Sequence, residues 1–437
     1  MIPLPPIDVS EPPPRGSTPV GLIAVCHQLV VSGCVAMRAI PRVLSIIFGV
    51  LAPEASLPQP SSICCWLLRL GLFALREPLT IANDWVFLID HSVQIGTTKM
   101  CVILGLRLGE VPYPSRALRF SDVCLVALFP VEQSTGEIVA EQLKKAAFRT
   151  GIPRQIVSDH GSDVKKGSEL FAAKYVDTII TYDAAHHAAC VLKRRLEHDP
   201  RWSEFIAQLS QTRARIQQTD KACFLAPSLR TKARFMNMQP LMKWSRKILQ
   251  LLDFGVANER VSEKAEASYG WLRAFRAELE KWWRWESTVR CSVAFVRKRG
   301  LSCSCQLDLA KELAALPEAE RDDVLAIEMC DFVAEQSRAA RPGERLVGST
   351  EVLESLFGKF KTMEHQESQS GITSFVLSLG SLLGEWTVER VAAAMQATPV
   401  KHTLQWLQDL LPASLQSQRR LAFTTSTPVN KTSQTPK

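Results

Sequence analysis

Two short apolar runs that each end on an aspartate constrain this chain more than any other feature of its sequence. In the first run, five apolar residues from Trp85 onward lead into Asp90, and 69 positions later a similar run leads through Ile156 and Val157 into Asp159. A buried strand does not normally finish on an unpaired carboxylate, because desolvating a charge is costly. Two strands that each deliver an aspartate at the C-terminal end therefore predict a shared metal-binding site.

The segments around these aspartates predict an α/β fold. We expect strands at 85–90, 100–108 and 123–129, a helix at 136–150, a strand ending at Asp159, a helix at 164–174 and a strand at 178–182. This order is that of the ribonuclease H-like fold, a mixed sheet in which the first and fourth strands are parallel neighbours. Asp90 and Asp159 are then expected to meet at one edge of the sheet, where a third acid from a later helix can join them.

The remainder of the chain has helical patterning. The predicted organisation is a flexible N-terminus at 1–17, a helix-turn-helix region at 18–80, the first part of the ribonuclease H-like domain at 81–199, an all-helical insertion at 200–348, a third-acid helix with C-terminal helices at 349–422, and a flexible tail at 423–437. A helix from Pro60 to Gly71 is the candidate for the DNA groove, with Arg69 as a DNA contact. The alternative is a plain helical cap on the next domain.

The charge distribution indicates a polyanionic partner. The net charge is +8, but residues 191–300 alone carry 23 Lys or Arg against 11 Asp or Glu. Such a basic module is typical of nucleic-acid binding, and DNA is the expected partner. Trp283 and Trp285 in this module are candidates for stacking on a base, although tryptophans in a helical domain more often belong to the core. The alternative for the charge is a solvated helical surface that happens to be basic.

Cysteine usage and hydropathy predict a cytoplasmic protein without a membrane span. The twelve cysteines occur without a secretory signal or a CxxC pair, so we expect reduced thiols. The apolar stretch at 18–52 is interrupted by His27, Arg38, Pro41 and Arg42, and so it falls short of the roughly 20 apolar residues that cross a bilayer.

The third acid is expected on the helix that follows Ser349 and Thr350. This helix has two candidates, Glu351 and Glu354. We favour Glu354, because Lys361 lies seven positions further, on the same helical face, where its ammonium can reach a DNA phosphate. Glu351, at the helix start, is explained by its favourable interaction with the helix dipole.

Two aspartates and one glutamate suit phosphodiester cleavage by two metal ions. That chemistry needs hard oxygen ligands that hold two Mg²⁺ ions about 3.5–4 Å apart, one to generate the nucleophile and one to stabilise the leaving oxygen. The expected cofactor is therefore a pair of Mg²⁺ ions, with Mn²⁺ as the alternative metal. Asp163, which follows Gly161 and Ser162, is better explained as a turn residue than as a ligand.

Four motifs together resemble a bacterial insertion-sequence transposase of the DDE class. They are the runs Leu88–His91, Val157–Asp163, Tyr182–His186 and Glu351–Lys361. The long insertion before the glutamate is similar to that of hAT and Mutator-like transposases. Asp183-x-x-His186 resembles a (Cys/Asp)-x-x-His motif of some of these families, and the spacing from Glu354 to Lys361 resembles half of an insertion-sequence signature.

The resemblance implies hydrolysis of a phosphodiester at a transposon end, followed by attack of the freed 3′-hydroxyl on target DNA. Asp90 would bridge two metal ions, Asp159 and Glu354 would each hold one, and Asp183 with His186 would orient the scissile phosphate or a water. A dimer or larger assembly on DNA follows from joining two ends. The alternatives are a non-catalytic DNA-binding protein and a ribonuclease H-like nuclease that does not join DNA.

Overall fold

The computed structural model describes residues 10–14, 16–51, 56–95, 98–228, 235, 238–255, 259–367, 374–410 and 420–423. Most of the two predicted flexible ends, 1–17 and 423–437, lies outside these ranges. Among the described helices, none is both long enough and apolar enough to cross a membrane. All twelve cysteines are free thiols.

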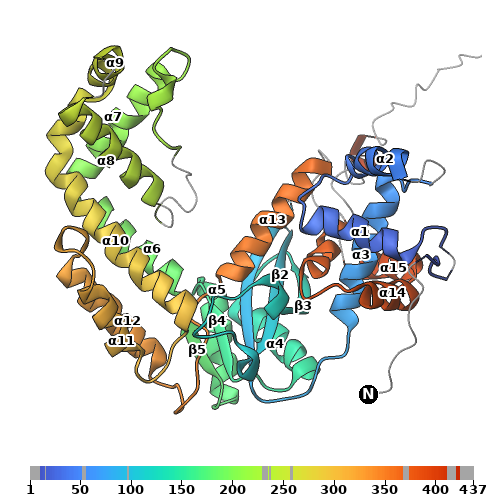
Figure 1. The fold of residues 1–437 in the computed structure, drawn as a ribbon. Coiled ribbons are helices and arrows are strands. Elements are labelled where there is room, and N and C mark those ends of the chain that lie inside the picture. Colours follow the sequence, from blue (N-terminus) through green and yellow to red (C-terminus); the bar gives the residue numbers. More distant parts are fainter. Residues whose placement is uncertain are drawn as a thin grey trace, which may run out of the picture.

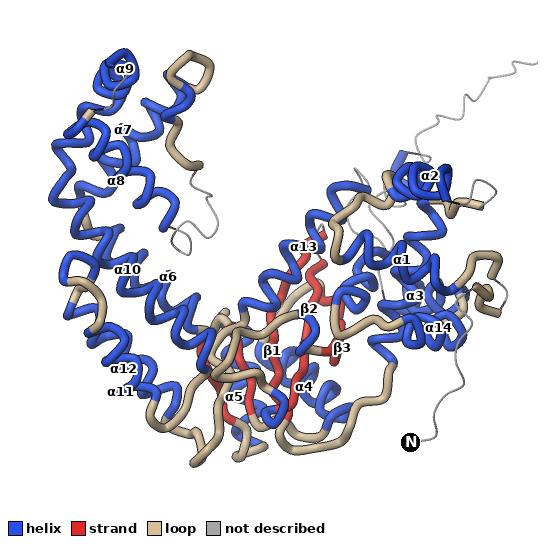
Figure 2. The backbone as a smooth tube through the Cα atoms, viewed as in Figure 1, coloured by secondary structure: helices blue, strands red, loops and turns tan. Residues whose placement is uncertain are grey.

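The centre of the molecule is a five-stranded mixed sheet with the strand order β3-β2-β1-β4-β5 (Figures 1 and 2). Its strands are β1 (Trp85–Ile95), β2 (Thr98–Arg107), β3 (Cys124–Val131), β4 (Gln155–Ser158) and β5 (Ile179–Tyr182). The β1–β2 and β2–β3 pairs are antiparallel, whereas the β1–β4 and β4–β5 pairs are parallel. The ribonuclease H-like arrangement predicted from the sequence is therefore confirmed.

Each face of the sheet packs against its own set of helices. Because successive side chains of a strand point to opposite faces, Phe87 and Ile89 of β1 belong to one core, while Val86 and Leu88 belong to another. The first core contains side chains of α4 (Gly136–Thr150) and α5 (Ser162–Lys174). The second contains side chains of α1 (Val20–Val31), α3 (Pro60–Arg76), α13 (Glu351–Glu367), η6 (Ser374–Leu382), α14 (Val388–Ala397) and α15 (Val400–Leu410).

The N-terminal helices pack against the C-terminal helices. α3 is central to this region and contacts η6, α14, α1, β3 and α15. The prediction that this helix ends at Gly71 is wrong, because a Cβ at Gly71 would lie 1.7 Å from the backbone oxygen of Leu377 in η6. Gly71 thus permits close packing inside a helix that continues to Arg76. Enclosed on so many sides, α3 does not offer the free face that a groove-binding helix needs.

The helices between β5 and α13 form an arm that extends away from the sheet (Figure 1). They are α6 (Ala184–Glu197), α7 (Pro200–Ile216), α8 (Gln239–Phe254), α9 (Glu259–Tyr269), α10 (Arg276–Arg299), α11 (Cys305–Ala314) and α12 (Asp323–Ser337), with η3 (Ala222–Phe224), η4 (Gly270–Phe275) and η5 (Glu318–Glu320) between them. The predicted helical insertion therefore exists, but it begins at Ala184 and not at 200. The reason is packing, since α6 shares a core with α7–α10 through Val191 and Leu192.

Candidate active site

Asp90 lies inside β1 and not at its end. β1 continues to Ile95, and Asp90 stands opposite Val102 of β2. The parallel pairing with β4 stops earlier, at Leu88 opposite Val157. The predicted strand end at Asp90 is therefore wrong for β1, because β2 continues the ladder. Asp90 nevertheless lies just beyond the last β1–β4 pair, at the carboxyl edge of β4.

Asp90 belongs to the face of the sheet that α13 covers. Val86 and Leu88 share a core with α13, and strand alternation places Asp90 on the same face. α13 contributes Leu353 and Leu356 to this core. Glu354, which lies between them in sequence, is half-buried. The third predicted acid thus lies on the helix that packs over Asp90.

A tight turn fixes the backbone at Asp159, directly after β4. The Asp159 Oδ1 atom accepts a hydrogen bond from the Gly161 N–H at 3.0 Å. His160, between them, has the left-handed φ of 59°, which is uncommon for a residue with a side chain. Its ring stacks on Tyr182 of β5, with 4.2 Å between ring centroids and 6° between planes. Asp159 therefore leaves β4 at the same edge of the sheet as Asp90.

The three predicted acids interact electrostatically although they come from distant parts of the chain. Burial, and after it the charge of Asp159, raises the pKa of Asp90 to about 7, and the charge of Glu354 contributes in the same direction. Burial also raises the pKa of Glu354 to about 7, followed by the charges of Asp183 and Glu351 and, last, that of Asp159. Half-buried carboxylates that repel one another are strongly stabilised by a cation.

The donor chemistry of these acids suits a hard divalent cation, but their side chains do not converge on one point. Carboxylate oxygens are the ligands that Mg²⁺ and Mn²⁺ prefer. Within the described ranges, no group of three or more His, Cys, Asp or Glu side chains is placed so that it could hold a metal ion. Asp90, Asp159 and Glu354 would hold an ion only after their side chains turn toward a common centre. The predicted pair of Mg²⁺ ions therefore stays a prediction.

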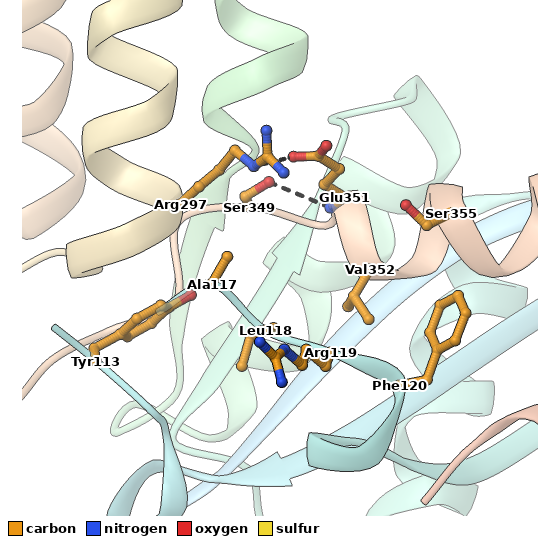
Figure 3. A pocket seen from close by; sticks show the side chains of 10 residues that line it. All are labelled: Tyr113, Ala117, Leu118, Arg119, Phe120, Arg297, Ser349, Glu351, Val352 and Ser355. Carbon is orange, nitrogen blue, oxygen red and sulfur yellow. Dashed lines mark hydrogen bonds and ion pairs between the residues drawn. The ribbon is translucent and has the colours of Figure 1, made fainter. Parts of the chain in front are cut away.

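Glu351 has a different partner from Glu354. Its carboxylate forms an ion pair with Arg297 of α10 (Figure 3), and its N–H donates to the Ser349 hydroxyl at 3.2 Å. Burial raises the pKa of Glu351, and Arg297 opposes that shift. The charge of Glu354 contributes to the raised pKa of Asp90, so Glu354 stays the preferred prediction for the third acid.

Asp183 links the start of the arm to the start of α13. Its side chain is fully buried and caps α6, because Oδ1 accepts from the His186 N–H at 2.6 Å. Its Oδ2 accepts from the N–H and the hydroxyl of Thr350, at 2.5 and 3.0 Å. Asp183 therefore positions the helix that carries Glu354, a role that the sequence motif alone did not suggest. The half-buried His186 ring lies 5.8 Å from the Tyr182 ring between centroids.

A second polar group, which sequence reasoning did not identify, lies beside Asp90. The His91 Nδ1 atom is 3.7 Å from the Asp163 carboxylate, and its Nε2 atom is 3.2 Å from the Ser134 hydroxyl. Burial lowers the pKa of His91, and Asp163 counteracts this. Asp163 also accepts from the Val164 N–H at 3.0 Å, but it lies in the first turn of α5 and not in a loop turn as predicted. The only sequence signal for His91 was its place next to Asp90.

Of the two predicted basic DNA contacts, one is exposed and the other is hydrogen-bonded within the protein. Lys361 is exposed on α13, in keeping with its prediction. The Arg69 guanidinium donates to the backbone oxygens of Thr398 and Met395 instead, at the end of α14. Its hydrogen bonds inside the protein account for Arg69 without DNA.

The two tryptophans are accounted for by packing in the arm. Trp283 is 7% exposed, and the Arg246 guanidinium lies 4.3 Å from its ring centroid. Trp285 is half-buried and donates its N–H to Asp322 at 3.1 Å. Trp283 is too deeply buried to stack on a base. For the half-buried Trp285, base stacking stays a prediction.

Comparison with known proteins gives structural similarity but no sequence match. No protein-family model matches the chain, and no curated protein matches it. Among solved structures, the chain is similar to the Drosophila P element transposase strand transfer complex, with a TM-score of 0.40 and 10% sequence identity over 84% of this chain and 92% of that chain. Values this low do not indicate function, which has to come from the residues of the chain itself.

Proposed function

We propose that this protein is a DDE transposase that cleaves DNA at transposon ends with divalent metal ions and joins those ends to target DNA. The observation that supports the proposal is that the charges of Asp159 and Glu354 act on Asp90 at one edge of a ribonuclease H-like sheet. On the sequence resemblance, we place it among bacterial insertion-sequence transposases with a hAT- or Mutator-like helical insertion.

In this proposal the three acids share two metal ions. Asp90, on the central strand, would hold the ions together with Asp159 and Glu354. The raised pKa values of Asp90 and Glu354 support the assignment, because burial and neighbouring carboxylates disfavour their charged forms, and a divalent cation would offset both effects. Bound metal ions would supply a nucleophilic water and stabilise the leaving oxygen.

The proposed partner is DNA. The basic excess of residues 191–300 falls largely on the arm, and Lys361 is exposed on the helix of the third acid. A polyanion is attracted to such a surface by release of its counterions. Because two ends must be joined, we propose that the protein works as a dimer or larger assembly on DNA.

A strand-cleavage assay with Mg²⁺ or Mn²⁺ tests the proposal. We expect the parent to cut DNA that carries the element's ends, and Asp90→Ala and Glu354→Gln to abolish cutting. Glu141→Gln is the control, because it removes the same kind of charge from an exposed position on α4, which covers the other face of the sheet. Equal cleavage by the parent and Asp90→Ala would refute the proposed active site.

The same assay separates two other functions. A non-catalytic DNA-binding protein would bind DNA without cutting it under any metal condition. A nuclease would cut without producing joined molecules, so strand-transfer products on a sequencing gel distinguish it from a transposase.

A further inference from the structure

A pocket lies where three segments meet beside the first turn of α13 (Figure 3). These segments are the β2–β3 connection at 108–123, the end of α10 and the start of α13. The pocket has a volume of about 260 Å³. It borders the flank of α13 that carries Glu351 and Ser355, next to the flank that carries Glu354.

Two arginines and one glutamate give this pocket its charge. Arg297 enters from α10 and Arg119 from the β2–β3 connection. Glu351 pairs with Arg297, and the two side chains are 33% and 42% exposed, respectively. Among the charged side chains that line the pocket, two guanidinium groups stand against one carboxylate, and Asp122, outside the lining, interacts electrostatically with Arg119 and Tyr113. The hydroxyl groups of Tyr113 and Ser355 add neutral donors to its wall.

The pocket lies at the junction between the arm and α13. Gly300 ends α10 with a φ of 67°, and a Cβ there would lie 2.6 Å from the Tyr113 ring. The β2–β3 connection is thus packed closely against the base of the arm. The Arg297–Glu351 pair crosses the same junction, from the last turns of α10 to the first turn of α13.

We infer that this pocket binds a backbone phosphate of the DNA strand that reaches the acids, with Arg119 and Arg297 as ligands and Glu351 as the internal competitor for Arg297. The inference rests on the proposed function, because it takes DNA as the substrate. Guanidinium groups match phosphate and carboxylate in the same bidentate way, so a phosphate can replace the Glu351 carboxylate on Arg297. When DNA binds, the ion pair between Arg297 of the arm and Glu351 of α13 is replaced by an ion pair between Arg297 and the DNA phosphate.

The test is DNA binding by fluorescence anisotropy across a salt series. Arg119→Gln and Arg297→Gln should each weaken binding about five- to tenfold and lower the salt slope by about one. Glu351→Gln should tighten binding by a similar factor, because Arg297 loses its competitor. Lys145→Gln is the control, since it removes one exposed positive charge on α4, which covers the opposite face of the sheet.

Neutral methylphosphonates placed singly along the DNA locate the phosphate. One such position should weaken binding by the parent but not by Arg297→Gln. Binding by all the variants equal to that of the parent would overturn the inference. A second result would also overturn the inference: inorganic phosphate raises the Tm of the parent but not of Arg297→Gln, while the two proteins bind DNA equally. The pocket would then bind free phosphate and not a phosphate of DNA.

The two proposals fail in different ways. If the parent binds DNA through these arginines but never cuts it, the catalytic proposal falls and the phosphate site stands. If the parent cuts DNA and the pocket variants bind like the parent, only the phosphate site falls.

Discussion

Replacing Asp183 by alanine tests how the helix that carries Glu354 is held in place. The buried carboxylate caps α6 through the His186 N–H and fixes Thr350, the residue before α13, through its N–H and hydroxyl. A helix-capping side chain contributes about 0.5–2 kcal/mol, and Asp183 serves two helix starts at once. Because the side chain is fully buried, the orphaned N–H groups have no water to replace it. We therefore expect Asp183→Ala to lower the free energy of unfolding by about 2–4 kcal/mol.

Urea unfolding measures this loss, and single-turnover cleavage measures its consequence for the site. Asp322→Ala is the control, because Asp322 caps α12, a helix of the arm, through the Leu325 N–H at 2.9 Å. Both variants should be less stable than the parent. Only Asp183→Ala should cut DNA more slowly under conditions in which both are folded. A loss of stability below about 0.5 kcal/mol, or equal cleavage by the two variants, would refute the positioning role.

Three further predictions follow from the same geometry. The folded-state pKa of Asp90 and Glu354 is about 7, whereas that of an unfolded carboxyl is about 4. Between these pH values the folded protein binds more protons than the unfolded chain, so without metal its Tm should fall as the pH rises through that window. Asp90→Asn should make this fall in Tm shallower, and an unchanged slope would contradict the prediction. Lys361→Gln should lower the salt slope of DNA binding by about one, as measured by anisotropy, and an unchanged slope would remove it from the interface. Gly71→Ala should lower the urea midpoint sharply, because its Cβ would meet backbone at 1.7 Å, whereas Gly358→Ala, with open space around it, should keep or raise that midpoint.

The strands were predictable because their signals are local. The apolar runs before Asp90 and Asp159 marked β1 and β4, although β1 continues to Ile95 and β4 ends at Ser158, and the helix with Glu354 begins where Ser349 and Thr350 predicted. Where the prediction failed, the missing information lay in a distant partner. The end of α3 was misplaced because Gly71 serves a close contact with η6 and does not end the helix.

Roles of individual polar residues could not be read from the sequence. Arg69 is a basic residue on a helix that was predicted to bind DNA, yet it donates to backbone oxygens at the end of α14, more than 300 residues away in the chain. Asp183 belongs to a motif that suggested chemistry, and the fold uses it to connect two helix starts. A side chain's partner depends on which elements the fold brings beside it.

The sequence by itself determined the order of strands and helices and indicated three candidate acids, because hydrophobic periodicity acts over a few residues. Only the tertiary structure decided which acids interact, that Arg297 pairs with Glu351 across the base of the arm, and that Trp283 is buried whereas Trp285 is half-buried. Those outcomes depend on packing between segments far apart in the chain, where burial and charge act through space and not along the sequence.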